Sequence, residues 1–475
     1  MSSLIALGLY VALMLWIGWR ARTRTHDAAD FYVGGRALGG WVAALSSLAS
    51  SSSAWTLLGI SSLAYVSGIA ALWLLPGTLL GLVLNWYLIA PRLRRLSSEH
   101  RWVTLTDVIV AASESAWRKR LRLSASAITV VSFLFYVAAQ LTAAGVAFSQ
   151  AFALPPTLSM SVGAAIVLIY TLLGGFWAVS LTDTLQGLLM ALVALILPLM
   201  ALVAVGGPLA LWSAMQQLEG GALSHVMGAH VGWAGVGFVL GTFGIGIGWT
   251  GQPHVLNRYM ALADDAALRR GRQVAWTWTL ITYSGMLLLG WCGRVLLGGL
   301  GDGETVFFAT GYALLPAAAA GVLVAAVVSA VMSTADSQLL VASSCMGYDL
   351  ESASTGHGLR WHRWWVGAMT LVALLVAIFL PASIFSRVLF AWHALAAAFG
   401  PLVVARVLGY SSTGRYSFAA MWVGFAGTVL LNWQPDTVGD IAERLLPYFV
   451  ASVIVLVDII TSARRADRAR RQEPG

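Results

Sequence analysis

A stretch rich in hydroxyl and carboxylate groups lies inside one of the most apolar parts of the chain. Ser333 and Thr334 are adjacent, and Asp336 and Ser337 follow within one helical turn. Residues three and four apart share a helix face, so the first serine, the aspartate and the second serine would point the same way. Such oxygens suit a hard cation such as sodium, by extension from other hard ions. An aspartate at mid-membrane costs about 2.5–3.5 kcal/mol, so this one predicts a partner or a function.

Residues 46–53 form a second polar stretch, reading Ser-Ser-Leu-Ala-Ser-Ser-Ser-Ser within the apolar span 41–67. Serine hydroxyls compete for backbone hydrogen bonds and weaken a helix. We therefore expect the helix to open near Ala49 and Ser52, which would leave main-chain carbonyls free to hold a cation. The alternative is close helix packing, because small residues also line helix contacts in membranes.

Residues 241–253 form the matching interruption, with five glycines, the last of them Gly251, followed by Gln252-Pro253. The spacing of Gly244 and Gly248 also fits a plain helix contact. The ending favours a real break, because proline lacks a backbone donor and clashes inside a helix. Two interrupted spans in corresponding positions indicate the binding site of a coupled transporter.

Other polar and aromatic residues near these breaks have two interpretations each. Asp183, near the start of a predicted span, is either a first-turn acid or part of a second cation or proton site. Gln140 either forms a hydrogen bond between helices or binds the solute. Trp55 and Trp249 lie within a turn or two of the breaks, which makes them the better candidates for contact with a solute.

Composition places the whole chain in a membrane. It is 59% hydrophobic and 10% charged, with a mean hydropathy of +0.80, and apolar runs of eighteen or more residues recur along it. The fold class is therefore all-α and polytopic. The thirteen predicted spans are 3–20, 41–67, 70–90, 124–152, 157–175, 182–204, 231–252, 273–299, 311–346, 364–380, 384–407, 416–433 and 446–463.

The positive charges set the predicted orientation. With the N-terminus outside and the C-terminus in the cytoplasm, the outer segments hold only Arg294, Arg387 and Arg444 of the 28 basic residues. This bias follows the positive-inside rule and explains the net charge of +8 without nucleic acid. Most arginines are accordingly interpreted as topology anchors, and no basic residue is expected at the depth of the breaks.

Six ordered stretches give the chain a family resemblance. They are Asp30-Phe-Tyr-Val-Gly-Gly-Arg36-Ala-Leu-Gly, Leu45-Ser-Ser-Leu-Ala-Ser through Trp55, Gly174-Gly-Phe-Trp-Ala-Val-Ser-Leu-Thr-Asp183-Thr-Leu-Gln186, Gly251-Gln-Pro-His254, Met332-Ser-Thr-Ala-Asp-Ser-Gln-Leu-Leu340 and Phe390-Ala-Trp-His-Ala-Leu-Ala-Ala-Ala-Phe-Gly-Pro401. Together they resemble the sodium/solute symporter family, and within it the bacterial sodium/proline symporters. The matches span nearly the whole chain.

The resemblance implies a five-plus-five inverted-repeat core of the LeuT type, with one helix before it and two after. The corresponding regions are 1–40 for the extra helix and loop, 41–207 and 208–410 for the two repeats, and 411–475 for the last two helices and a basic tail. Carried over by position, the sodium site would comprise Ala49, Ser52, Ala330, Ser333 and Thr334. A second cation or proton site would comprise Asp183, Asp336 and Ser337, where the acid at 336 replaces the serine of relatives that have this site.

The resemblance also implies a solute pocket between the breaks, for which the candidates are Ser51, Ser53, Trp55, Gln140, Ile245 and Trp249. The chain departs from the proline carriers at Ser51, Val137 and Ile245, where they have an aspartate and two aromatic residues. The expected function is sodium-coupled symport of proline or another amino acid by alternating access, in a bacterial inner membrane and as a monomer. Proton coupling, and a sugar or organic acid as solute, are the alternatives.

Enzyme chemistry is not expected. The chain contains neither a Gly-x-Ser-x-Gly nor a His-Glu-x-x-His motif, and no two acids lie four residues apart within a span. A transporter-like sensor remains a third interpretation, which would bind a ligand without carrying it across the membrane.

Overall fold

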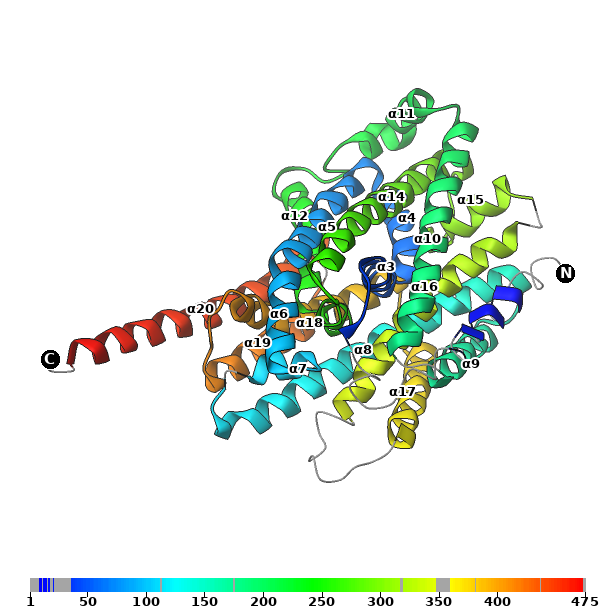
Figure 1. Ribbon diagram of the computed structural model, residues 1–475. Helices are drawn as coiled ribbons and strands as arrows, with labels where there is room; N and C mark the ends of the chain where they lie inside the picture. Colours follow the sequence, from blue (N-terminus) through cyan, green and yellow to red (C-terminus); the bar gives the residue numbers. More distant parts are fainter. Residues whose placement is uncertain are drawn as a thin grey trace.

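The protein is described by a computed structural model that covers residues 36–111, 113–173, 176–316, 319–346, 359–380, 382–435 and 437–472, with parts of 8–20. Figure 1 shows the helices gathered in one bundle, from which α20 projects toward the C-terminus. Within these ranges no strand is found, and one isolated bridge pairs Leu38 with Leu262. The all-helical prediction is confirmed for this part of the chain.

The helices follow one another along the described parts of the chain. Their bounds are α3 Gly40–Ser51, η3 Trp55–Gly59, α4 Ile60–Ser67, η4 Gly68–Trp73, α5 Leu74–Val83, η5 Leu84–Ile89, α6 Ala90–His100, α7 Leu105–Val110, α8 Ser115–Phe152, α9 Pro156–Leu173, α10 Phe176–Val205, α11 Pro208–Gln217, η6 Leu218–Ser224, α12 Gly232–Gly244, η7 Ile245–Gly251, α13 Pro253–Met260, α14 Asp265–Leu297, η8 Gly303–Thr305, α15 Val306–Leu314, α16 Ala320–Ser344, α17 Leu359–Phe379, α18 Ile384–Val407, α19 Gly414–Asn432, η10 Val438–Asp440 and α20 Ile441–Gln472.

Eight stretches of the described chain are long and apolar enough to cross a bilayer, and two shorter apolar helices accompany them. The first predicted span, 3–20, lies largely outside the described residues. The predicted span 311–346 is wrong as a single helix. It contains the end of α15 and all of α16, because the chain turns extended at Leu315 and Pro316 follows, which cannot donate a backbone hydrogen bond.

The first predicted break is present between α3 and η3. Helix α3 ends at Ser51, and Ser52 has the non-helical angles φ −101° and ψ 52°. The serine hydroxyls account for this ending: Ser50 and Ser51 donate back to carbonyls one turn earlier, and Ser53 accepts from the amide of Trp55. The following turn, η3, is a π-helix, a form that is frequent at functional sites.

The second predicted break is present between α12 and α13. The chain tightens into the 3₁₀ segment η7, becomes extended at Gln252 and resumes as α13 from Pro253. The glycines of this region serve packing as well. A Cβ at Gly246 would lie 1.7 Å from the carbonyl oxygen of Gly77, so α5 and η7 touch backbone to backbone. A Cβ at Gly244 would meet the Leu445 side chain of α20, and one at Gly248 would meet the Trp392 ring of α18, so these two glycines also lie at helix contacts.

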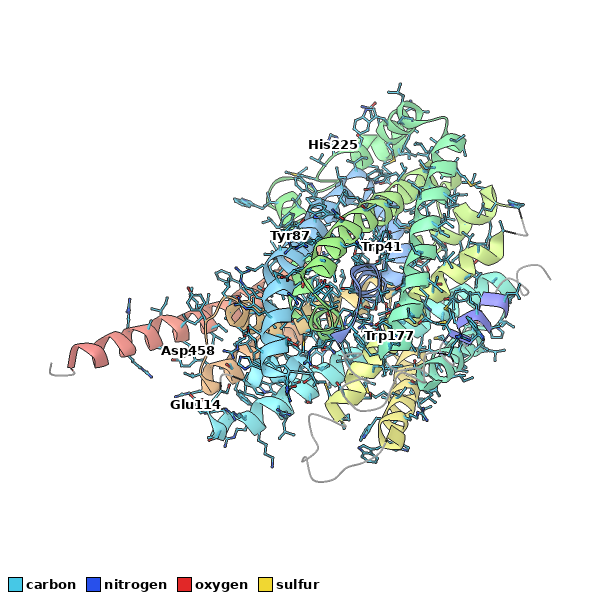
Figure 2. The ribbon with its side chains drawn as sticks, viewed as in Figure 1. Trp41, Tyr87, Glu114, Trp177, His225 and Asp458 are labelled. Carbon is cyan, nitrogen blue, oxygen red and sulfur yellow. The ribbon has the colours of Figure 1, made fainter. Side chains whose placement is uncertain are left out.

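One end of the bundle is tied together by acidic side chains (Figure 2). Asp458 on α20 accepts from Ser412 and Thr413, and Glu114 accepts from the amide of Gly414. These contacts join α8 and α20 to the loop between α18 and α19.

Candidate functional site

The first break and α16 bring a set of oxygen atoms together in the core. The hydroxyl of Ser333 lies 3.1 Å from the carbonyl oxygen of Ala49 and 3.2 Å from that of Ala330. The hydroxyl of Thr334 lies 3.5 Å from the same Ala49 oxygen. These residues and Ser52 are all buried. Converging carbonyl and hydroxyl oxygens beside an unwound helix are suited to a dehydrated monovalent cation.

A buried ion pair lies directly beside this oxygen cluster. Arg258 on α13, only 1% exposed, donates to the carboxylate of Asp183 on α10 at 3.1 Å. It also donates to Ser46 at 3.1 Å and to the His254 carbonyl at 2.6 Å. Its guanidinium stacks over the ring of Phe176. The guanidinium of Arg258 on α13 therefore forms hydrogen bonds that connect this helix to α3 and α10.

The second buried acid, Asp336, has weaker hydrogen bonding than Asp183. One of its oxygens lies 3.2 Å from the hydroxyl of Ser337. That hydroxyl has a single proton to donate, and the Ser333 carbonyl is the nearer acceptor at 2.8 Å. The other oxygen of Asp336, and the second oxygen of Asp183, have no hydrogen-bond partner in the described part of the chain. Two buried carboxylates facing one guanidinium leave an excess negative charge, which favours a bound cation or proton.

Arg258 differs from its sequence interpretation, and one of the two interpretations of Asp183 is wrong. Arg258 was interpreted as a topology anchor at the membrane surface, but it is buried in the protein core beside the breaks. Asp183 is the eighth residue of α10 and no helix cap. The sequence places Asp183 and Arg258 each in apolar surroundings, which could have suggested that they pair. It does not show that the two side chains, on α10 and α13, come together.

A tyrosine of the N-terminal region joins this cluster from outside. The Tyr10 hydroxyl accepts from Ser329 at 2.7 Å and from Gln186 at 3.2 Å. Ser329 precedes Ala330, and Gln186 lies one turn beyond Asp183. Tyr10 therefore bridges the two helices that carry the candidate ion ligands, a role that its isolated position in the sequence did not indicate.

A small cavity lies between the two breaks. Its lining is Ser51, Trp55, Thr78, Tyr136, Ile245, Gly246, Trp249, Tyr283, Val388, Leu389 and Trp392. It measures about 10 Å³, which is room for one water molecule. Five of the eleven lining residues are aromatic. The Trp392 ring donates to the Ile245 carbonyl at 3.0 Å. This volume is too small for an organic solute, so side chains would have to move before one could bind.

Four of the six predicted solute residues line this cavity: Ser51, Trp55, Ile245 and Trp249. Gln140 instead accepts from the Ala54 amide at 3.1 Å and so satisfies the backbone at the first break. Ser53 caps Trp55 beside it.

A second glutamine, Gln252, plays the matching part at the other break, where it donates to the Gly248 and Trp392 carbonyls at 2.9 Å each. The sequence analysis missed three aromatic residues that also line the solute cavity: Tyr136, Tyr283 and Trp392. Each comes from a different helix with no distinguishing local pattern.

Comparison with known proteins identifies the family. The model of the sodium:solute symporter family matches residues 31–424. The chain belongs to this family. The resemblance inferred from the six sequence stretches is thereby confirmed.

Several curated family members are similar over nearly their whole length. The chain is 33% identical to the sodium/proline symporter of Salmonella typhimurium over 487 residues, which covers 99% of this chain and 95% of that protein. It is 31% identical to the high-affinity proline transporter of Bacillus subtilis over 462 residues, covering 95% and 96%. Sodium-coupled symport is accordingly the activity of this family member.

Solved structures agree on the fold. A sodium-coupled sialic acid symporter in a substrate-bound, outward-open state superposes with a TM-score of 0.76 at 19% identity, covering 95% of this chain and 98% of that one. A transporter of the nucleobase-cation-symport-1 family superposes with a TM-score of 0.56 at 12% identity, covering 92% and 96%. At these identities the likeness concerns the helical architecture alone.

Proposed function

We propose that this protein couples inward sodium flow to the uptake of proline or a closely related amino acid. The observation that carries the proposal is the oxygen cluster between the first break and α16. There Ser333 lies within about 3 Å of two main-chain carbonyl oxygens, those of Ala49 and Ala330. With Ser52 and Thr334 these residues would hold the coupling sodium ion.

The solute would bind in the aromatic cavity between the breaks. Relatives named as proline transporters over nearly the full length support proline as the first candidate. Ser51, Trp55, Ile245 and Trp249 line the cavity and would contact the solute, while Gln140 and Ser53 would hold the first break in shape. A solute carboxylate would be stabilised by helix ends and by the sodium charge, because the cavity lining contains no basic residue.

The second ionic group would be Asp183, Asp336 and Ser337. Its excess negative charge supports a bound sodium ion or a proton. Asp336→Asn distinguishes the two: loss of the pH dependence of uptake with unchanged sodium activation indicates a proton, whereas reduced sodium cooperativity indicates a cation.

The architecture that fits this function has thirteen spans, with two inverted five-helix repeats in 41–207 and 208–410. Region 1–40 would precede the repeats, and the two helices of 411–475 would follow them. The two spans interrupted at residues 52–53 and 245–252 would be the first helices of the two repeats. The arginine distribution supports an outer N-terminus and a cytoplasmic C-terminus in a bacterial inner membrane. We propose that the monomer is the functional unit.

Uptake by purified protein in proteoliposomes tests the proposal. An inward sodium gradient should drive accumulation of radiolabelled L-proline, and choline in place of sodium should abolish it. Equal accumulation in sodium-free buffer under an imposed pH gradient would instead support proton coupling. Binding without any flux would identify a sensor rather than a transporter.

A further inference from the structure

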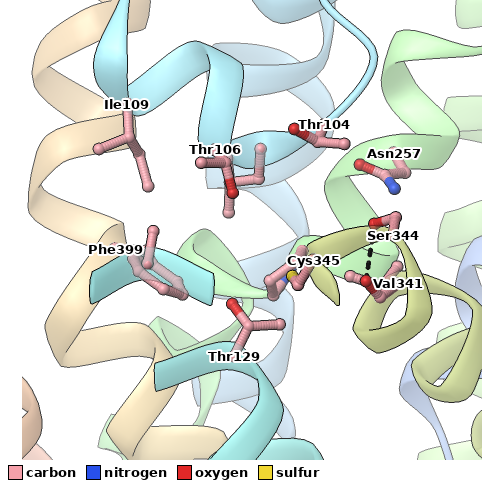
Figure 3. Close-up of a pocket in the computed structure, with 12 residues that line it drawn as sticks. Thr104, Thr106, Ile109, Thr129, Asn257, Val341, Ser344, Cys345 and Phe399 are labelled. Carbon is pink, nitrogen blue, oxygen red and sulfur yellow. Dashed lines mark hydrogen bonds between the residues drawn. The ribbon is translucent and has the colours of Figure 1, made fainter. Parts of the chain in front are cut away.

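A groove on the outer surface of the bundle lies between α3, α10 and α14. It measures about 410 Å³ and has ten lining residues, two from α3, two from α10 and six from α14. The internal cavities are far smaller. The one in Figure 3, which Asn257 and Cys345 line, has about 10 Å³, as does the solute cavity. The groove is therefore large enough for part of a molecule much bigger than water.

The chemistry of the lining changes along α14. Arg270, Gln273 and Thr277 follow one another at intervals of three and four residues, so they form one stripe of the helix. Ile281, one turn further on, ends the stripe. At 1.5 Å per residue, Arg270 and Ile281 lie about 16 Å apart along the helix axis. This is close to half of a bilayer core of ~30 Å, so the groove runs from a charged end to an apolar end over the depth of one leaflet.

The other two helices are aligned with this gradient. The start of α3 lies level with the charged end, because a Cβ at Gly40 would meet the Cβ of Arg270. Trp41 follows directly, lines the groove and is 55% exposed (Figure 2). Toward the apolar end, the ring nitrogen of Trp278 donates to the Gly187 carbonyl of α10 at 2.7 Å. An exposed tryptophan beside a charge, followed by apolar walls, is typical of a surface at the boundary between headgroups and acyl chains.

The charged end of the groove carries a positive charge that lacks an acidic partner. Among the described residues Arg270 forms no ion pair, and none of the lining residues is acidic. The two acids at the start of α14 are engaged elsewhere: Asp264 accepts from a backbone amide of its own helix at 2.6 Å, and Asp265 pairs with Arg94. A guanidinium binds phosphate oxygens through two parallel hydrogen bonds, and Gln273 adds an amide donor. The charge therefore favours an anionic headgroup, because the amine of a zwitterionic headgroup would have no acid to bind.

We propose that this groove binds one anionic phospholipid of the cytoplasmic leaflet. The phosphate would bind Arg270 and Gln273. The glycerol backbone would lie against Trp41, and one acyl chain would run along α14 as far as Ile281. Under the orientation proposed above, α14 begins at the cytoplasmic surface, where anionic headgroups attract basic residues. The groove shares no residue with the solute cavity or with the proposed sodium site.

Thermal unfolding of the delipidated protein in detergent tests the proposal. Dioleoyl phosphatidylglycerol should raise the midpoint of unfolding by several degrees through mass action, whereas dioleoyl phosphatidylcholine should not. Arg270→Ala should lose most of the shift with phosphatidylglycerol. Arg269→Ala is the matched control, because it removes the same charge from the same turn of α14 but does not line the groove, and it should keep the wild-type shift. Equal shifts with the two lipids, or equal losses in the two variants, would overturn the site.

Two further probes separate the lipid from other occupants. Glycerol 1-phosphate at the same concentration should give no shift, and a shift equal to that of phosphatidylglycerol would identify a site for a soluble anion and contradict the lipid. Ala191→Trp fills the apolar end of the groove and leaves Arg270 in place, so it should also remove most of the phosphatidylglycerol shift. An undiminished shift in this variant would contradict an acyl chain in the groove. Absence of sodium-driven proline uptake would contradict the proposed function and not this site, because none of these measurements includes a transport step.

Discussion

At the scale of single residues, the hydroxyls of α16 provide the sharpest prediction. Ser333→Ala or Thr334→Ala removes one oxygen from the proposed sodium site, and a bond to a charged group contributes about 1.5–3 kcal/mol. Each variant should therefore raise the sodium concentration for half-maximal uptake by roughly ten-fold or more. Ser343→Ala is the matched control, because among the described residues that hydroxyl donates to the Leu340 carbonyl of its own helix and to no atom of the proposed site. Unchanged sodium activation in both variants would remove these hydroxyls from the site.

The two buried acids differ in what their loss should do to stability. Asp183→Asn leaves Arg258 buried without its carboxylate partner, and breaking such a pair costs about 3–5 kcal/mol. Asp336→Asn leaves the ion pair intact and removes the excess negative charge. We therefore expect a markedly lower midpoint of thermal unfolding for the first variant and little change for the second. Equal midpoints would show that the ion pair does not hold α10 and α13 together.

At the scale of elements, the close contact between α5 and η7 predicts a steric effect. In Gly246→Ala the new Cβ would lie 1.7 Å from the Gly77 carbonyl oxygen, so the two backbones must separate. Overpacking of this kind costs about 1–3 kcal/mol and would displace Ile245 and Trp249 from the solute cavity. Uptake should fall and thermal stability should drop. Gly367→Ala in α17, where a Cβ meets no atom within 4 Å, should leave both unchanged.

At the scale of the whole molecule, the sequence predicted what is local and missed what depends on assembly. The serine run and the glycine stretch each carry their own helix-breaking chemistry, and both breaks are present. The burial of Arg258 was missed because it depends on α13 packing against α3 and α6, and on the salt bridge that Arg258 forms with Asp183 of α10. The split of 311–346 into α15 and α16 was missed because its hydrophobicity is continuous across Pro316. Cavity walls assembled from one residue per helix leave no periodic trace in the sequence.

Sodium and solute should also stabilise the whole protein together. Any ligand that binds only the folded state adds about 2.7 kcal/mol at one hundred times its dissociation constant. Because the proposed ion and solute sites share α3, whose Ala49 faces the ion and Ser51 the solute, binding of one should strengthen the other by the same factor in both directions. Differential scanning fluorimetry should thus give a larger shift for L-proline in sodium than in choline, and Ser333→Ala should shrink that difference. An identical proline shift in both salts would show that the two sites are energetically independent, which a coupled symporter does not allow.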